Sequence, residues 1–428
     1  MKLNLKIWHT VLLIWLVILI LRFERIIELI ELLYSYSLII ITDFIFASGQ
    51  FSLSLADNIA GILIFLLIPV VVIYFVKRVQ FFNKKIFASA VIIFFLVFGF
   101  LFSPIITDRN PDFYKDIAVT KLLPPLSTVK EIRLKEQKSD DINKQQEFIR
   151  VKNKAIKLPF DESVIYCDSA LISGNELIYY QKGNPKTILV EDVQPENGIY
   201  WSAKLFVFGT DEFGRDIFTR LIYGTRISLF IGFCAVGISL ILGLLLGFLA
   251  GYKSGWLDLV LNRTTDLFLA FPVIFMIIFI LALFGNNMIS VIVVLGLSGW
   301  MSLFKLVKTE ISSIKTKDFF VSSKLLGVSP FSLMKKEFLP LILASVIVNI
   351  IFQFGNVVLA ESALSYLGLG LGNDYSSWGS MIQSGQEYIT QSWWMIVLPG
   401  VLLILTLLTI NDLGAKIKAH FNPRIKYD

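Results

Sequence analysis

Residues 226–251 read RISLFIGFCAVGISLILGLLLGFLAG, and they are the clearest indication of the fold class. A helix of this length, at about 1.5 Å per residue, can cross a hydrocarbon layer of about 30 Å. The rest of the chain has the same character, since 55% of its 428 residues are hydrophobic and its mean hydropathy is +0.72. A water-soluble core cannot hide that much apolar surface, so lipid has to be the solvent of a large part of the chain.

Other apolar runs have a similar length and composition, and together they predict an all-α polytopic membrane protein with about eight transmembrane helices. The first run is flanked by cations, as in a signal peptide, but no small-residue cleavage site follows Leu21, which favours an uncleaved anchor. Just beyond it, residues 24–31 mix charged and apolar side chains and predict an amphipathic helix along the membrane surface. The runs lie near 7–22, 58–76, 86–104, 226–251, 263–284, 288–304, 341–360 and 393–411.

Positive charge predicts the orientation of these helices, because Lys and Arg in short loops are retained in the cytoplasm. The loops 77–85 and 305–339 and the tail after residue 411 are rich in cations. All three lie inside if the N-terminus is inside, so both termini are expected in the cytoplasm. The net charge of +6 then has a topological origin. Since the cations form no stacking platform with aromatic side chains, we expect no nucleic acid partner.

The same alternation places residues 105–222 outside the cell, as the one polar segment long enough for a domain. Its first half, with a charge run from Lys130 to Lys144, is expected to be loosely ordered or helical. Its second half carries short β-prone pieces separated by turn residues, which predicts a small antiparallel β module. These pieces are 164–167, 177–180 and 187–190.

The inventory of reactive side chains argues against catalysis. The chain has two histidines, His9 and His420, and two cysteines, Cys167 and Cys234, which are not placed to form a metal cluster. It contains no phosphate-binding Gly-x-x-x-x-Gly-Lys-Ser/Thr loop and no Gly-x-Ser-x-Gly motif. We therefore expect no enzyme activity, no metal and no cofactor in this chain. Uphill transport would have to draw its energy from another protein.

The connection 305–339 carries more bulky apolar side chains than a solvated loop needs. Gly327 interrupts it, and Ser329-Pro330 predicts a helix N-cap followed by proline at the first helical position. The sequence therefore predicts two short helices with a sharp bend. In the second helix, apolar residues spaced i, i+3 and i+7 predict one face suited to a partner's groove. These residues are Phe331, Met334 and Phe338.

Residues 318–327, DFFVSSKLLG, followed by Leu339-Pro340, resemble the EAA loop of permeases from ATP-binding-cassette (ABC) importers. In that family the loop forms the coupling helix that sits in a groove of the cytoplasmic ATPase, and the resemblance implies this role here. The alternative is an interfacial loop that packs only against its own bundle. The implied coupling residues are Asp318, Phe319, Phe320, Ser322, Ser323, Lys324, Leu326, Gly327, Leu339 and Pro340.

Further segments resemble the oligopeptide, dipeptide and nickel importers among these permeases, which are binding-protein-dependent transport inner membrane components of the C type. They include GTDEFGRD at 209–216, LSYLGLG at 364–370 and NPR at 422–424. The resemblance implies a type I importer permease core. The implied parts are an N-terminal extension with two helices at 1–85, the first permease helix at 86–104, an extracytoplasmic insertion at 105–205, a core with five helices at 206–424 that includes the coupling loop 308–340, and a cytoplasmic tail at 425–428.

The resemblance also implies a function and partners. The chain would be the permease subunit of an ATP-driven importer in the bacterial inner membrane, with peptides as the first choice of cargo and a nickel chelate as the second. Its partners would be a homologous second permease, two cytoplasmic ATPases that bind ATP and Mg, and an extracytoplasmic solute-binding protein. Two other classes stay open, an ABC export permease and a self-contained secondary transporter, although the latter usually carries ionisable residues in midspan.

Polar residues on the seventh predicted helix are candidates for the translocation path. Asn349, Gln353 and Asn356 share one face of an apolar span, where they either form interhelical hydrogen bonds or line the solute path. Glu361, near the outer boundary, either pairs with a cation or contacts solute. These four residues are therefore the candidate path.

Two glycine motifs have both a structural and a functional interpretation. The stripe Gly243, Gly247 and Gly251 permits close helix packing, either inside this subunit or against a second permease. The sequence 209–211 is either a structural turn, with Asp211 bonded to nearby backbone amides, or a contact for arriving solute.

Overall fold

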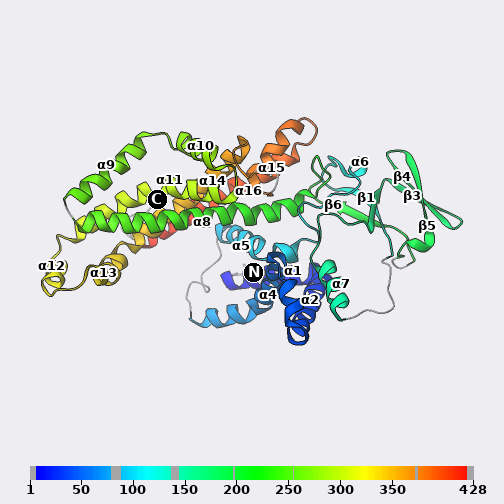
Figure 1. Ribbon diagram of the computed structural model, residues 1–428, viewed down its shortest axis with the longest axis horizontal. Coiled ribbons are helices and arrows are strands. Elements are labelled where there is room, and N and C mark those ends of the chain that lie inside the picture. The colour runs from blue at the N-terminus through cyan, green and yellow to red at the C-terminus, as the bar shows by residue number, and fades with distance from the viewer. Residues whose placement is uncertain are drawn as a thin grey trace, which may run out of the picture. The chain divides into compact units, whose positions relative to one another are not determined.

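The computed structural model describes residues 6–78, 88–135, 144–195, 198–253, 255–371 and 375–421, and Figure 1 labels its elements. The chain divides into two compact units. The first comprises Met1–Arg226 and Ser384–Pro399, and the second comprises Ile227–Gln383 and Gly400–Asp428. Two long helices, α8 (Ile217–Tyr252) and α16 (Trp394–Phe421), contribute residues to both units.

Six helices among the described residues are long and apolar enough to cross a membrane, and a bent pair adds a seventh if it forms one broken span. A further apolar helix, α1 (Ile7–Leu21), is shorter. Each predicted apolar run coincides with helix over most of its described residues, and the prediction of a helical multi-pass membrane protein is confirmed. The six long helices are α4 (Leu53–Arg78), α5 (Ala88–Ile106), α8, α11 (Met288–Ile314), α14 (Leu339–Tyr366) and α16.

The run at 263–284 is the bent pair, so the single helix predicted there is wrong. Its two parts, α9 (Trp256–Ala270) and α10 (Val273–Phe284), meet at 91°. The cause is Pro272, which has no N–H to donate and whose ring keeps Phe271 in an extended conformation (φ −84°, ψ 133°).

The N-terminal extension and α5 share one hydrophobic core in the first unit. α4 packs along α5, where the Phe65 and Phe102 rings meet edge to face at 5.4 Å. Asp57, in the first turns of α4, forms an ion pair with Arg226, whose guanidinium also donates to Ser103 Oγ at 3.3 Å. The extension is thus tied to α5 by apolar packing and by a shared arginine.

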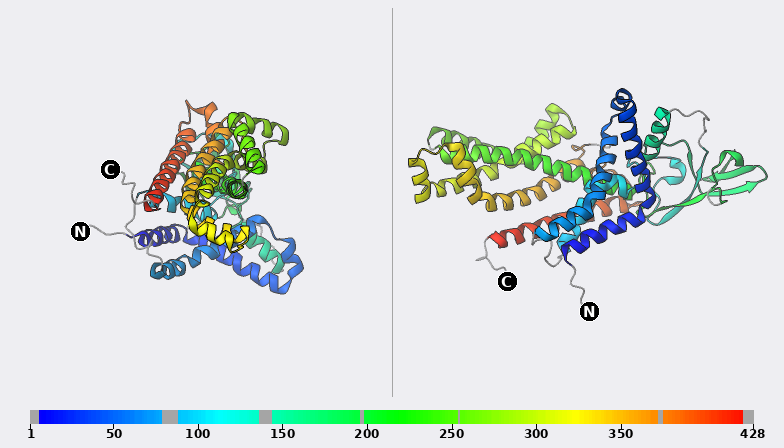
Figure 2. Two further views of the ribbon diagram at one scale, coloured as in Figure 1. Left: turned by 90° about the vertical axis from the view of Figure 1, so that its left-hand side faces the viewer. Right: turned by 90° about the horizontal axis from the view of Figure 1, so that it is seen from below.

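The amphipathic helix predicted at 24–31 belongs to α2 (Phe23–Thr42), which is followed by the short α3 (Phe44–Gly49). Arg25 is 8% exposed and donates to the carbonyl oxygens of Pro104 (3.1 Å) and Ala155 (2.6 Å). α2 also lies beside α7 (Lys144–Ala155), as Figure 2 shows. Because Arg25 finds carbonyl partners inside the unit, this part of the polar face is covered by the chain itself.

The insertion contains two three-stranded antiparallel sheets, with strand orders β2-β1-β6 and β3-β4-β5. The β module predicted for its second half is confirmed, and the three predicted pieces overlap β2, β4 and β5. The strands are β1 (Ser127–Arg133), β2 (Val164–Cys167), β3 (Ser169–Ser173), β4 (Glu176–Gln181), β5 (Asn184–Leu189) and β6 (Ser202–Phe206), and a short helix, α6 (Ile117–Thr120), precedes them.

The central strand β1 lies where the sequence predicted loose order or helix, so that prediction is wrong for 127–133. The reason is Glu131, which is 3% exposed and forms ion pairs with Arg109 (2.6 Å) and Arg133 (2.8 Å). A buried charged residue hides the alternation of apolar side chains that marks a strand. The helical alternative holds for α7, and residues 136–143 of the charge run lie outside the described residues.

Close helix packing organises the second unit. The glycine stripe 243, 247 and 251 on α8 faces α11, and a Cβ added at Gly247 would lie 2.8 Å from Val307 Cβ. A Cβ at either of the other two glycines would meet α11 side chains within 2.9 Å. The interpretation of this stripe as packing inside the subunit is therefore confirmed.

Candidate functional site

The loop that resembles an EAA loop folds as a helical hairpin over residues 318–338. It begins with α12 (Asp318–Leu325), turns at Gly327, whose φ is +74°, and continues in α13 (Pro330–Leu333). The Ser329 hydroxyl accepts a hydrogen bond from the Ser332 backbone N–H at 3.3 Å, as predicted for an N-cap followed by proline. The predicted pair of short helices with a sharp bend is thus confirmed.

The inner side of the hairpin packs on its own bundle. Phe320, Leu333 and Phe338 are at most 3% exposed. The Phe338 ring lies 5.2 Å from the Phe320 ring and 5.8 Å from the Phe248 ring of α8. These aromatic contacts connect both arms of the hairpin to the transmembrane helices.

The single apolar face predicted from Phe331, Met334 and Phe338 is wrong. Phe331 is 69% exposed, whereas Phe338 is fully buried. The reason is a π turn, η3 (Met334–Phe338), which holds more residues per turn than an α-helix and so removes the i, i+7 alignment. The turn runs directly into α14, whose second residue, Pro340, has no N–H for the helical ladder.

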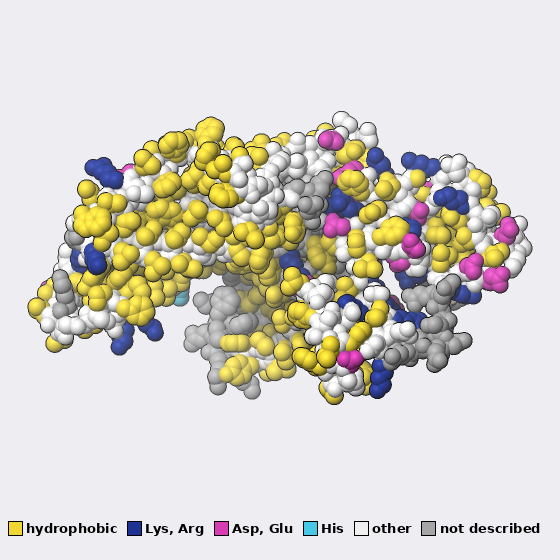
Figure 3. Space-filling model, viewed as in Figure 1, with side chains coloured by type: hydrophobic (Ala, Val, Ile, Leu, Met, Phe, Trp, Pro, Cys, Tyr) yellow, Lys and Arg dark blue, Asp and Glu magenta, His cyan; other side chains and the backbone are white. Residues whose placement is uncertain are grey.

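The outer side of the hairpin carries an exposed apolar surface, which consists of Phe319, Leu325, Leu326 and Phe331. The two leucines beside the bend are each 83% exposed. Figure 3 shows Lys and Arg side chains at the same end of this unit, whereas hydrophobic side chains cover most of its visible helices. In a segment outside the lipid, where the positive charge predicts this hairpin, such a cluster marks a contact with another molecule. The hairpin thus divides into a side that packs on the bundle and a side that is available to a partner.

The other implied coupling residues lie around this surface. Asp318 and Ser322 are exposed on α12, where the Ser322 hydroxyl donates to the Asp318 carbonyl oxygen at 3.0 Å. Ser323 is half-buried, and the side chain of Lys324 lies outside the described residues. Leu339, which is half-buried, and Pro340, which is exposed, begin α14 and form the joint between hairpin and helix.

An apolar cavity of about 230 Å³ adjoins this joint. Residues of α8, α11, the π turn and α14 line it, including Phe248, Phe338 and Leu339. The cavity leaves space beside the buried ring that connects the hairpin to α8. The cavity also borders the α8–α11 contact, because Val307 and Ile311 of α11 line it.

The amide stripe on α14 does not form one surface. Gln353 is 8% exposed and its amide lies against Gly299 of α11, whereas Asn356 is exposed and Asn349 is half-buried. Gln353 Nε2 and Oε1 and Asn349 Oδ1 are buried without a hydrogen-bond partner among the described residues. Such groups call for a partner, which a bound water, a solute or a rearranged neighbour would supply. The Gln353 side chain thus lies inside the bundle, where α14 faces α11.

Glu361 lies in a buried cluster of serine hydroxyls. It is 1% exposed and accepts hydrogen bonds from the hydroxyls of Ser228 (3.2 Å) and Ser365 (3.0 Å). Contact of Glu361 with solute stays a prediction. Sequence reasoning missed Ser228 because it lies on α8, far from Glu361 along the chain. The LSYLGLG segment at 364–370, which contains Ser365, was the one part of this cluster that the sequence had singled out.

The 209–216 motif is a structural turn. Asp211 is 2% exposed, and its carboxylate accepts from the Arg215 backbone N–H (2.8 Å), from Arg215 Nε (2.7 Å) and from Arg220 Nη1 (3.0 Å). Gly209 has φ +77°, and the Trp394 indole N–H donates to the Thr210 carbonyl oxygen at 3.1 Å. The structural interpretation of residues 209–211 is therefore confirmed.

Beside this turn, Glu212 is an acid in a nearly dry site. Burial raises the pKa of its carboxyl, and the neighbouring Asp211 charge raises it further. Its Oε1 lies 3.6 Å from Arg215 Nη2. The turn thus holds two acids against two arginines.

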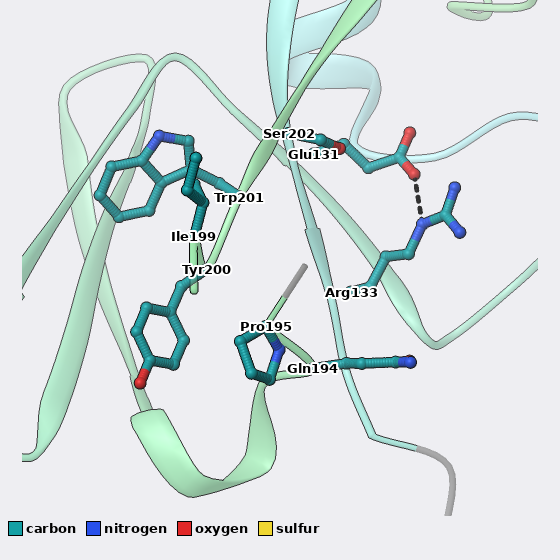
Figure 4. Close-up of a pocket in the computed structure, with 8 residues that line it drawn as sticks. All are labelled: Glu131, Arg133, Gln194, Pro195, Ile199, Tyr200, Trp201 and Ser202. Carbon is teal, nitrogen blue, oxygen red and sulfur yellow. Dashed lines mark hydrogen bonds and ion pairs between the residues drawn. The ribbon is translucent and has the colours of Figure 1, made fainter. Parts of the chain in front are cut away.

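The insertion has a small surface cavity of about 120 Å³, shown in Figure 4. Trp201 and Tyr200 form one side, and Arg133, with its ion pair to Glu131, forms the other. Ligand pockets commonly enclose about 300–1,000 Å³. The cavity is therefore too small to be the cargo site.

Known proteins match the part of the chain that contains the hairpin and the buried residues of α14. The family model described as "Binding-protein-dependent transport system inner membrane component" matches residues 243–427, which include the hairpin, Gln353 and Glu361. The dipeptide transport system permease protein of Alkalihalophilus pseudofirmus is 33% identical over 235 residues, covering 55% of this chain and 77% of that protein. The corresponding protein of Bacillus subtilis is 33% identical over 239 residues, covering 56% and 73%.

Other matches are more distant. The oligopeptide transport system permease protein of Haemophilus influenzae is 32% identical over 217 residues, covering 51% of this chain and 70% of that protein. A solved structure of the methionine ABC transporter MetNI, in an inward facing conformation, aligns with 46% of this chain and 96% of that chain at 17% identity. Its TM-score of 0.37 is too low to support an argument about the fold.

Proposed function

Since this chain belongs to the family of binding-protein-dependent transport system inner membrane components and is a membrane permease, we propose that it forms half of the translocation path of an ATP-driven peptide importer. The observation that carries the proposal is the exposed apolar side of the hairpin. Leu325 and Leu326, each 83% exposed, sit at the bend of a segment whose inner side is fixed to α8. A partner that moves the bend would therefore move the transmembrane helices.

The proposed partners are those that the resemblance to ABC importer permeases implies. Two cytoplasmic ATPases bind ATP and Mg and hold the outer side of the hairpin in a groove, and a homologous second permease completes the path. A solute-binding protein delivers cargo on the other side of the membrane. This chain itself carries no phosphate-binding loop, so it is the non-catalytic subunit.

The proposed orientation places the hairpin and both termini in the cytoplasm and the β module outside. The cation-rich connection that contains the hairpin supports it, because such loops stay on the cytoplasmic side. Peptides are the proposed cargo because the matched relatives are named as dipeptide and oligopeptide permeases. A nickel chelate is the second candidate on the resemblance alone.

Replacing both bend leucines by serine tests the proposal. The double variant Leu325→Ser with Leu326→Ser should reduce ATPase co-purification from mild detergent roughly tenfold, since buried apolar anchors dominate such interfaces. ATP-dependent uptake should fall with it. Leu171→Ser, at a 59% exposed leucine on β3, is the matched control and should change neither quantity. Parental ATPase retention in the double variant would contradict the proposal.

A further inference from the structure

Glu361 is a buried carboxylate near the end of α14, and hydroxyl groups from three segments surround it. Ser365 Oγ lies 3.0 Å and Ser228 Oγ 3.2 Å from its oxygens. Ser362 Oγ lies 3.5 Å away, and Ser377 also forms a side-chain hydrogen bond with it. The donors thus come from α8, from α14 and from the residue that precedes α15 (Trp378–Gly385).

This carboxylate is held by neutral groups. Among the described residues, no Lys, Arg or His forms an ion pair with Glu361. A buried acid without a counter-charge depends on hydrogen bonds for its stability. The serine hydroxyls supply these bonds, so the acid and the three segments depend on one another.

Glycine and tryptophan bring the segments together. A Cβ added at Gly379 would lie 2.6 Å from Ser365 Cβ and 2.7 Å from Ser362 Cα, so only glycine permits this approach. Trp378 is fully buried, and its backbone N–H donates to Ser228 Oγ at 3.3 Å. The first turn of α15 is therefore attached to both α8 and α14 around Glu361.

We propose that Glu361 is a positioning residue of the transport cycle: its hydroxyl contacts hold the first turn of α15 against α8 and α14 in one state and release it in another. The inference rests on the proposed function, in which the helices rearrange around the solute path. Contacts between a carboxylate and hydroxyls suit a reversible attachment, because water can replace each bond when α15 moves away. Glu361 acts through α15.

A reporter cysteine on α15 tests this inference in the complete transporter complex. Met381 is 3% exposed, so Met381→Cys, with Cys167→Ser and Cys234→Ser in the same chain, should react slowly with a water-soluble maleimide. Glu361→Ala should speed the labelling about tenfold, since it removes several hydrogen bonds made by a buried acid. Ser228→Ala, which leaves α14 unchanged, should shift the rate in the same direction by a smaller factor.

The control is Glu310→Ala, which removes a carboxylate that accepts from Ser345 (2.9 Å), outside the serine cluster, and should leave the labelling rate unchanged.

A second readout separates positioning from folding. Trapping the ATPases with vanadate should change the labelling rate of the parent, whereas Glu361→Ala should label fast in both states. Glu361→Gln, which keeps the shape and one accepting oxygen, should recover part of the difference between states.

Each outcome decides between explanations. If complexes carrying Glu361→Ala and Ser228→Ala assemble and label at the parental rate in both states, the inference is overturned while the proposed function stands. If Glu361→Ala fails to fold, Ser228→Ala alone decides in the same way. If the parent forms no complex with an ATPase, the proposed function fails, and this inference fails with it.

Discussion

Asp211 shows what single residues contribute to this fold. Its carboxylate is buried and bonded to two arginines and two backbone amides, which fixes the turn before α8. The sequence predicted a turn here because the residue types suit one. It could not predict the Trp394 contact to Thr210, since that pair lies far apart along the chain. The residue types that favour a turn can be recognised locally, whereas a hydrogen bond to the turn from a residue far along the chain cannot.

Asp211→Asn should destabilise the first unit by roughly 3 kcal/mol, because breaking a buried ion pair leaves an uncompensated charge. The measurement is the thermal unfolding midpoint of the detergent-solubilised protein, which should fall. Asp266→Asn is the matched control, since Asp266 pairs with Lys305 at an exposed site and should leave the midpoint unchanged. Equal midpoints for Asp211→Asn and the parent would refute this role.

At the scale of elements, the glycine stripe brings α8 close to α11, and the π turn leads from the hairpin into α14. The α8–α11 contact depends on glycines that admit α11 side chains, while a cavity adjoins the turn before α14. Long apolar runs predicted the helices, and Ser329-Pro330 predicted the hairpin's second arm. The π turn could not be predicted, because the face assigned to Phe331, Met334 and Phe338 assumed α-helical spacing. The strand β1 could not be predicted, because the buried Glu131 interrupts the alternation of apolar side chains that marks a strand.

Gly247→Val should lower the thermal unfolding midpoint, because the new side chain would overlap Val307 at a site with no room, a cost of roughly 1–3 kcal/mol. Gly237→Val is the matched control on the same helix, since a Cβ there meets no atom within 4 Å. The control should leave the midpoint close to that of the parent. Similar losses for both variants would mean that helix propensity, and not the α11 contact, sets the effect.

At the scale of the whole molecule, the chain combines a permease core with an N-terminal extension and an insertion. The segments 318–327 and 364–370 resemble those of ABC importer permeases, and the family match at 243–427 bears out that resemblance, while the bounds of the core at 206–424 stay a prediction. The extension's contacts, such as Asp57 with Arg226, could not be predicted, because no local pattern marks a pair so distant in sequence. The length of the apolar runs thus predicts a membrane protein, whereas the packing of the N-terminal helices can be seen only in the structure.

The most direct test of the central claim places a photoreactive amino acid at position 326 in cells that contain the complete transporter. If the outer side of the hairpin sits in a groove of the motor protein, illumination should cross-link this chain to the ATPase. The same amino acid at position 171, on β3, should give no such product. Transport-competent cells in which position 326 yields no cross-link to an ATPase would contradict the account.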